Sequence, residues 1–161
     1  MATRSTIALE FADGTVQQVY CHWDGYLSNN GQILLKHYSD PFKLRERIDL
    51  GDISSLKPTV GTKHAFSQFE QNKLSSEDYD KLYGDMTTFY GRDRGESGTE
   101  AKKFANFAEY VSEHAYEEYE YILRQIDGKA VWFVADHDNV YITLEQAFID
   151  EQDRIAQEEM A

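Results

Sequence analysis

The 161-residue sequence has few of the residues that cross-link, kink or break a chain: one Cys, two Pro and ten Gly. A single Cys excludes an intramolecular disulfide and a zinc site built on thiolates alone. The low Pro and Gly content excludes collagen-like and low-complexity classes. Long apolar runs are also missing. None approaches the ~18–20 residues that span a bilayer, and the first residues lack the apolar core of a secretory signal. We therefore expect a soluble, cytoplasmic protein.

Basic side chains are scarce as well, with 16 Lys and Arg against 29 Asp and Glu, a formal net charge of −13. Residues 1–99 hold 14 acids and 11 bases, a net charge of −3, whereas residues 100–161 hold 15 acids and 5 bases, a net charge of −10. This excess of acid argues against direct binding to nucleic acid or to anionic lipid. The acidic part is either a solvated surface that keeps the protein in solution, or a surface that competes with nucleic acid for a basic protein groove.

Apolar residues make up 41% of the chain and aromatic residues 14%. That content suits a folded protein rather than a disordered one, and the length suits one domain over residues 1–161. Asp13-Gly14 and Asp127-Gly128 are typical of tight hairpin turns. Because hairpins dominate the predicted strands, we predict an α+β fold in which packed helices and an acidic C-terminal helix surround a mainly antiparallel sheet.

Capping residues and apolar periodicity predict the helices. Asp40-Pro41 is typical of the start of a helix over 41–50, and Ser75 of the start of another. Phe104, Phe107, Ala108 and Val111 have helical spacing and predict a helix over 99–114. Thr143 is expected to cap a helix over 144–160 whose inward residues include Ile155. We expect a further helix over 30–38, a loop over 51–73, and strands over 5–11, 15–23, 86–90, 119–125, 130–136 and 140–142.

One polar-aromatic cluster follows the second predicted strand, in the run Tyr20-Cys21-His22-Trp23-Asp24-Gly25-Tyr26. Trp23 and Tyr26 offer flat faces for stacking or for a protein partner. His22 and Asp24 are able to transfer a proton or to bind a metal. The alternative is a set of core aromatics at the end of a hairpin. Cys21 lies in an apolar run, so we expect a small buried side chain rather than a nucleophile.

A second cluster, Gly91-Arg92-Asp93-Arg94-Gly95-Glu96, is expected to be a charged loop. Arg92 and Arg94 are suited to grip a phosphate or carboxylate bidentately. The alternative is a turn in which these Arg, Asp and Glu side chains pair with one another. If both clusters build one ligand site, the two turns meet and Arg92 or Arg94 approaches Trp23. The residues of that site are His22, Trp23, Asp24, Tyr26, Arg92, Arg94 and Glu96.

Signatures of catalysis are missing. The sequence has no phosphate-binding loop, no dinucleotide-binding glycine pattern, no paired metal-binding His and no nucleophile elbow. The five His residues are scattered, and adjacent carboxylates such as Glu117 and Glu118 are typical of solvated faces. We therefore expect no metal and no cofactor, and a binding protein rather than an enzyme.

The Tyr20–Tyr26 run is specific. Together with Tyr90–Glu96 and shorter blocks within residues 3–56 and 119–134, it resembles a widespread family of small uncharacterised proteins from bacteriophages and prophages. That family has no settled activity, so the resemblance implies a phage setting, the cytoplasm of a bacterial host and little chemistry. Residues 65–86 and the acidic helix after residue 143 lie outside the resemblance.

The leading hypothesis is an acidic, phage-encoded protein that antagonises a host defence complex, as an anti-CRISPR-like or anti-restriction inhibitor that mimics the charge of nucleic acid. Its partner would be a host protein, or protein–nucleic-acid complex, with a basic groove. The residues expected to bind the partner are Glu117, Glu118, Glu120, Glu145, Asp150, Glu151, Asp153, Glu158 and Glu159. The alternative is a small-ligand module that binds or sequesters a nucleotide-like anion through the 20–26 and 91–96 turns. A purely structural role is a third class, for which the sequence offers no positive sign.

Overall fold

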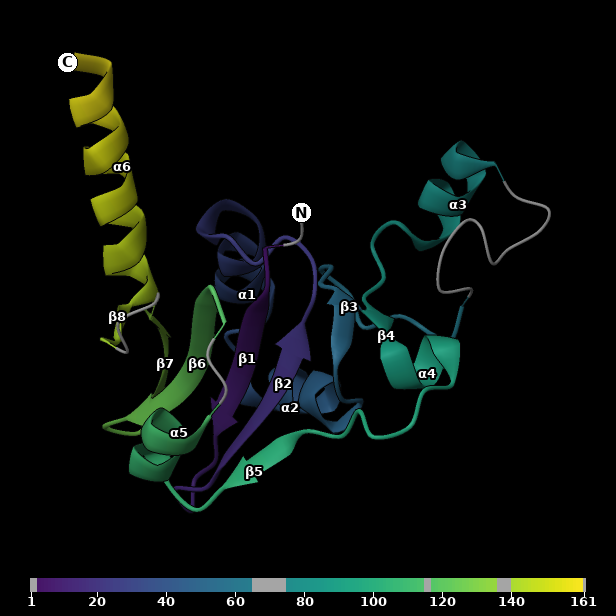
Figure 1. Ribbon diagram of the computed structural model, residues 1–161, viewed down its shortest axis with the longest axis horizontal. Coiled ribbons are helices and arrows are strands. Elements are labelled where there is room, and N and C mark those ends of the chain that lie inside the picture. The colour runs from purple at the N-terminus through teal and green to yellow at the C-terminus, as the bar shows by residue number, and fades with distance from the viewer. Residues whose placement is uncertain (1–2, 65–74, 115–116, 136–139, 161) are drawn as a thin grey trace.

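A single sheet organises the computed structural model, which describes residues 3–64, 75–114, 117–135 and 140–160 (Figure 1). The strands are β1 (Ser5–Glu10), β2 (Val16–Cys21), β3 (Ile53–Ser55), β4 (Thr88–Phe89), β5 (Lys102–Phe104), β6 (Tyr119–Ile126), β7 (Lys129–Ala135) and β8 (Ile142–Thr143). They lie in the order β4-β3-β2-β1-β6-β7-β8, and β5 pairs with the first half of β2. The helical segments are the π-helical turn η1 (Leu27–Gly31), α1 (Gln32–His37), α2 (Pro41–Asp49), α3 (Ser76–Tyr83), α4 (Tyr90–Arg94), α5 (Phe107–Glu113) and α6 (Leu144–Met160).

The α+β fold and the mainly antiparallel sheet are confirmed. Hairpins join β1 to β2 and β6 to β7 at the two predicted turns. Asp127 and Gly128 have φ angles of 51° and 79°, as the favoured two-residue hairpin turn requires. Two pairings are parallel, β1 with β6 and β2 with β3. Parallel pairing needs a crossover connection, and the long segment between β2 and β6 supplies one for β1 and β6.

Helices cover both faces of the sheet, so the central strand β1 is buried at all six positions. Ile7 and Leu9 point to one face, where they join a core that includes Leu44 and Ile48 of α2 and Leu144 of α6. Ala8 points to the other face and packs with Tyr110 of α5. Burial on two faces explains why the middle of β1 carries three consecutive apolar residues, Ile7, Ala8 and Leu9, instead of alternating with polar ones.

The helix predicted over 99–114 is wrong in its first half. Lys102–Phe104 form β5, which pairs with residues 16–18 of β2. The Asn106 side chain then accepts a hydrogen bond from the Glu109 amide at 2.8 Å, so α5 begins at Phe107. Phe104 and Phe107 have helical spacing, but they reach the same apolar cluster from a strand and from a helix.

Two segments predicted to be loops contain regular secondary structure. Within the segment predicted to be a loop, Ile53–Ser55 form β3, and Ile53 pairs with Cys21. The predicted charged loop at 91–96 is largely the short helix α4, which ends at Gly95 in the left-handed conformation (φ 76°). The last part of the expected loop, residues 65–73, lies outside the described residues.

The capping predictions are confirmed at three helices. The side chains of Asp40, Ser75 and Thr143 each accept a hydrogen bond from a backbone amide in the first turn of α2, α3 and α6. Of the helices in the described part of the chain, none is both long enough and apolar enough to cross a membrane.

Candidate functional site

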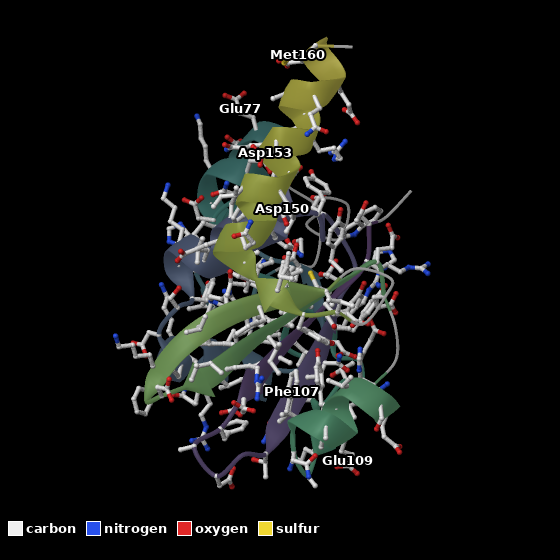
Figure 2. The ribbon with its side chains drawn as sticks, turned by 90° about the vertical axis from the view of Figure 1, so that its left-hand side faces the viewer. Glu77, Phe107, Glu109, Asp150, Asp153 and Met160 are labelled. Carbon is white, nitrogen blue, oxygen red and sulfur yellow. The ribbon has the colours of Figure 1, made fainter. Side chains whose placement is uncertain are left out.

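The acidic C-terminal helix α6 extends away from the sheet (Figure 1). Only Leu144 and Ala147, in its first turn, are buried. From Gln152 to Met160 every residue is exposed. Figure 2 shows Asp150, Asp153 and Met160 at increasing height along this helix, with the sheet below them. Ile155, expected to face inward, is 41% exposed because α6 has passed beyond the body of the protein.

The α6 carboxylates surround the helix instead of forming one face. Successive acids at positions 145, 150, 151, 153, 158 and 159 are 5, 1, 2, 5 and 1 residues apart, and each residue turns an α-helix by about 100°. All of them are exposed except Glu151, which is half-buried. The one basic residue of α6, Arg154, pairs with Glu158 at 2.8 Å. The projecting part is therefore an acidic rod that a partner is able to contact from several sides.

The expected second row of acids is interrupted at Glu120. This side chain is only 3% exposed, because α5 covers it. Its Oε2 lies 2.7 Å from Nε2 of His114 and accepts a hydrogen bond from the Tyr141 hydroxyl at 3.0 Å. Glu120 is thus a structural ion-pair partner and not a partner-binding residue. Glu118 is exposed, and Glu117 is half-buried, where burial raises the pKa of its carboxyl group.

The surroundings of His114, at the end of α5, favour the protonated form of its ring. Its Nδ1 contacts the Tyr110 carbonyl and its Nε2 faces the Glu120 carboxylate, so both ring nitrogens meet acceptors. An imidazole satisfies two acceptors only when both nitrogens carry hydrogen. Burial acts to lower the pKa of His114, but the Glu120 carboxylate and the Tyr110 carbonyl outweigh it, and the net effect raises the pKa. The ring also stacks on Tyr110 at 4.5 Å.

The polar-aromatic run Tyr20–Tyr26, at the end of β2, is partly buried and partly exposed to solvent. Trp23 is 45% exposed and Tyr26 40% exposed. Nδ1 of His22 hydrogen-bonds the Tyr20 hydroxyl at 2.7 Å, and its ring meets Trp23 edge-on at 4.7 Å. Asp24 occupies a tight turn with φ 57°. The exposed aromatics suit contact with a protein, since such residues often anchor interfaces.

Cys21 is fully buried at the end of β2, as expected. Burial raises the pKa of its thiol to about 11, so it carries almost no thiolate at neutral pH. Thiolate is the nucleophilic form of cysteine, and a nucleophilic role for Cys21 is therefore not supported.

Arg92 is not available as a free anion-binding group. Its guanidinium donates to the carbonyls of Val60, Gly61 and Thr87 at 2.9–3.2 Å and to the Asp93 carboxylate at 3.0 Å. Arg94 lies 3.7 Å from Glu96. The alternative in which Arg, Asp and Glu pair with one another therefore describes this segment better than an open anion site.

The two clusters also leave the sheet in opposite directions. β2 runs parallel to β3, whereas β4 runs antiparallel to β3. The 22–26 turn follows β2 and α4 follows β4, so the chain continues past opposite ends of this part of the sheet. Arg92 is directed to the carbonyls beside β4 instead of toward Trp23. The ligand site expected from both clusters is not assembled around Arg92.

A hydroxyl–imidazole–carboxylate arrangement lies beside α4, and the sequence analysis missed it because its residues are far apart in the chain. Nε2 of His64 lies 3.3 Å from the Thr88 hydroxyl, and Nδ1 lies 3.6 Å from Asp93 Oδ1. Catalytic triads use such groups. Here, however, Nδ1 contacts the Thr62 carbonyl at 2.7 Å, and His64 and Thr88 are both less than 8% exposed. The arrangement therefore fixes the chain around β4 and does not support hydrolysis.

Arg47 of α2 is completely buried. Its guanidinium carbon lies 3.7 Å from the centre of the Tyr38 ring. None of its three side-chain nitrogens has a hydrogen-bond partner among the described residues. Burial lowers the pKa of Arg47 to about 10, an effect that Tyr38 partly opposes. A buried charge with so little compensation destabilises a fold.

We accordingly expect Arg47→Met to raise the free energy of unfolding by about 1 kcal/mol, because an apolar side chain of similar length replaces an uncompensated charge. Urea denaturation measures the change. Lys43→Met is the matched control, since Lys43 is exposed and its ammonium lies 5.0 Å from the centre of the same Tyr38 ring. A loss of stability of 1 kcal/mol or more in Arg47→Met would show that the guanidinium is well compensated.

Comparison with known proteins finds no matching family model, no similar curated protein and no similar solved structure. Among the described residues, no group of three or more His, Cys, Asp or Glu side chains is placed to hold a metal ion. Function is therefore inferred from the residues of this chain, chiefly those of α6.

Proposed function

We propose that this protein is an acidic binding protein and that α6 occupies a basic, nucleic-acid-binding groove of its partner. The observation that carries the proposal is the projecting helix itself. Its 17 residues include six acids and one Arg, a net charge of −5. A helix of that length is about 26 Å long, which gives about 4 Å of helix axis per acid, close to the ~3.4 Å of duplex axis per phosphate of one DNA strand.

The proposed partner is a bacterial defence complex that handles nucleic acid, such as a CRISPR effector or a restriction enzyme. This setting is the one that the resemblance of the Tyr20–Tyr26 and Tyr90–Glu96 runs to phage proteins implies. Exposed Trp23 and Tyr26 and half-buried Glu117 supply further surface outside α6. In this proposal the protein acts by occupying the groove, so nucleic acid and the protein exclude each other, and attraction between opposite charges speeds their encounter.

The test is displacement of labelled DNA from purified CRISPR effector and restriction complexes, followed by fluorescence anisotropy. We expect the protein to displace DNA from at least one complex. The variant Glu145→Lys/Asp153→Lys/Glu158→Lys/Glu159→Lys should do so with affinity weakened by about 100-fold or more, because each reversed charge replaces an attraction by a repulsion. Displacement by the native protein should also weaken as the salt concentration rises.

The matched control is Glu46→Lys/Asp80→Lys/Glu100→Lys/Glu113→Lys. It changes the net charge by the same amount, and all four of its acids are exposed and lie outside α6. We expect it to displace DNA almost as the native protein does. Equal losses in the two variants would indicate a non-specific effect of net charge, and unchanged displacement by the α6 variant would refute charge mimicry by α6.

A further inference from the structure

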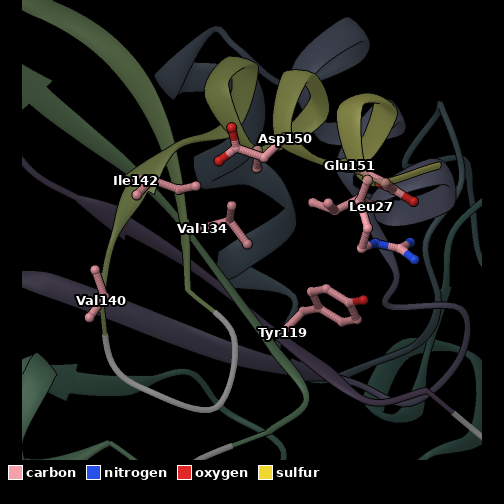
Figure 3. Close-up of a pocket in the computed structure, with 9 residues that line it drawn as sticks. Leu27, Tyr119, Val134, Val140, Ile142, Asp150 and Glu151 are labelled. Atoms are coloured by element: carbon pink, nitrogen blue, oxygen red, sulfur yellow. The ribbon is translucent and has the colours of Figure 1, made fainter. Parts of the chain in front are cut away.

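A pocket of about 350 Å³ lies where α6 meets the sheet (Figure 3). Its apolar lining includes Leu27 of η1, Val134 of β7, Ile142 of β8 and Ala147 of α6. In Figure 3 the Tyr119 ring lies across the pocket from α6. The volume is at the small end of the ~300–1,000 Å³ typical of ligand pockets, and it suits one or two side chains.

One wall of the pocket carries negative charge. Ala147, Asp150, Glu151 and Arg154 line it from α6, and their spacing of three and four residues places them along one side of the helix. Arg154 is already paired with Glu158 at 2.8 Å, and Asp150 accepts a hydrogen bond from Gln146 at 2.8 Å. The Glu151 carboxylate has neither a hydrogen bond nor an ion pair within the part of the chain that the structure describes. The carboxylates therefore outweigh the one cation at this wall.

We propose that this pocket receives a Lys or Arg side chain from the basic surface of the partner, an inference that rests on the proposed function. An apolar floor beneath a carboxylate rim matches the two parts of such a side chain. The aliphatic stem lies against apolar groups and the charged head stays at the polar edge. Ile155, 41% exposed and one turn beyond Glu151, extends the apolar side of α6 from the pocket toward the projecting rod. The pocket thus anchors the partner at the base of the helix whose acids bind it.

The first experiment tests the pocket without the partner. Butylguanidinium and hexylammonium are the probes, hexanol and hexanoate are the uncharged and anionic comparisons, and NMR chemical shifts report binding. We expect the cations to bind with millimolar affinity and to shift the signals of Leu27, Val134 and Ile142. Glu151→Gln should weaken cation binding by about tenfold and leave hexanol unchanged. The control Glu46→Gln removes an exposed carboxylate of α2 and should bind the cations normally.

Cation binding elsewhere, or equal binding of hexanoate, would overturn the proposal. The second experiment tests the variant Asp150→Asn/Glu151→Gln in the DNA-displacement assay. We expect its affinity for the partner to be about tenfold weaker than that of the native protein. If the probes bind but Asp150→Asn/Glu151→Gln displaces DNA as the native protein does, the pocket binds free cations and does not receive a side chain of the partner. If the four-site α6 reversal also leaves displacement unchanged, the proposed function itself fails, so the two failures are distinguishable.

Discussion

Asp93→Ala is expected to destabilise the protein by about 3–5 kcal/mol. The Asp93 side chain is completely buried, and its carboxylate accepts hydrogen bonds from the backbone amides of His64 and Phe89 at 3.1 and 2.8 Å. It also pairs with Arg92 at 3.0 Å. Removing one member of a buried ion pair leaves the other charge uncompensated, and such changes are among the most costly single substitutions.

Chemical denaturation measures this loss, with Asp85→Ala as the control. Asp85 is exposed on the segment before β4, and its substitution should change stability by less than about 0.5 kcal/mol. Arg92→Met in the Asp93→Ala background should recover part of the loss, because both charges are then absent. A loss below 1 kcal/mol for Asp93→Ala would mean that solvent reaches the site and that the pairing around α4 is not what holds β4 in place.

The features that the sequence specifies are those that depend on residues close together in the chain. Hairpins at Asp13-Gly14 and Asp127-Gly128 and the caps at Asp40 and Thr143 depend on neighbouring residues, and all were predicted. The sequence left two alternatives open for Arg92, an anion site and pairing within its own turn. It did not reveal the carbonyl partners of Arg92 at residues 60, 61 and 87, because those residues are distant in the chain. A guanidinium between glycines looks the same in a sequence whether it serves a ligand or the protein itself.

The burial of Glu120 also depends on residues that are distant in the chain. Alternation along β6 places Glu120 on the face of Ile122, opposite Tyr121, and that pattern was visible. What the sequence did not show is that α5 covers this second face, since Phe104 was assigned to a helix that is in fact a strand. Once both faces of β6 are covered, an acid on either face must find a partner, and His114 is that partner. By contrast, the exposure of the α6 acids follows from a local pattern and was foreseen.

The pairing of His114 with Glu120 makes the stability of the protein depend on pH. The pKa of His114 is raised in the folded protein above its ordinary value of 6.5, so folding favours the protonated ring. The stabilisation is fully present below about pH 6.5, where the unfolded chain also carries the proton, and it is lost as pH rises through the pKa of the folded state. We therefore expect the free energy of unfolding to fall as the pH rises above about 6.5.

Urea denaturation at several pH values tests this, with His114→Gln as the comparison because it keeps a side-chain donor but does not titrate. The difference in stability between native protein and variant should be largest near pH 6 and should shrink as pH rises.

The Cys21 thiol, whose pKa of about 11 also lies above its ordinary value, loses stabilisation only above about pH 9. It therefore does not contribute to the change in stability expected from His114. Glu120→Gln should also abolish the fall in stability above pH 6.5 and should cost most at low pH, because burial without the carboxylate disfavours the protonated His114 ring. A difference between native protein and His114→Gln that stays constant from pH 6 to 8.5 would mean that His114 is neutral in the fold and that α5 is held by packing alone.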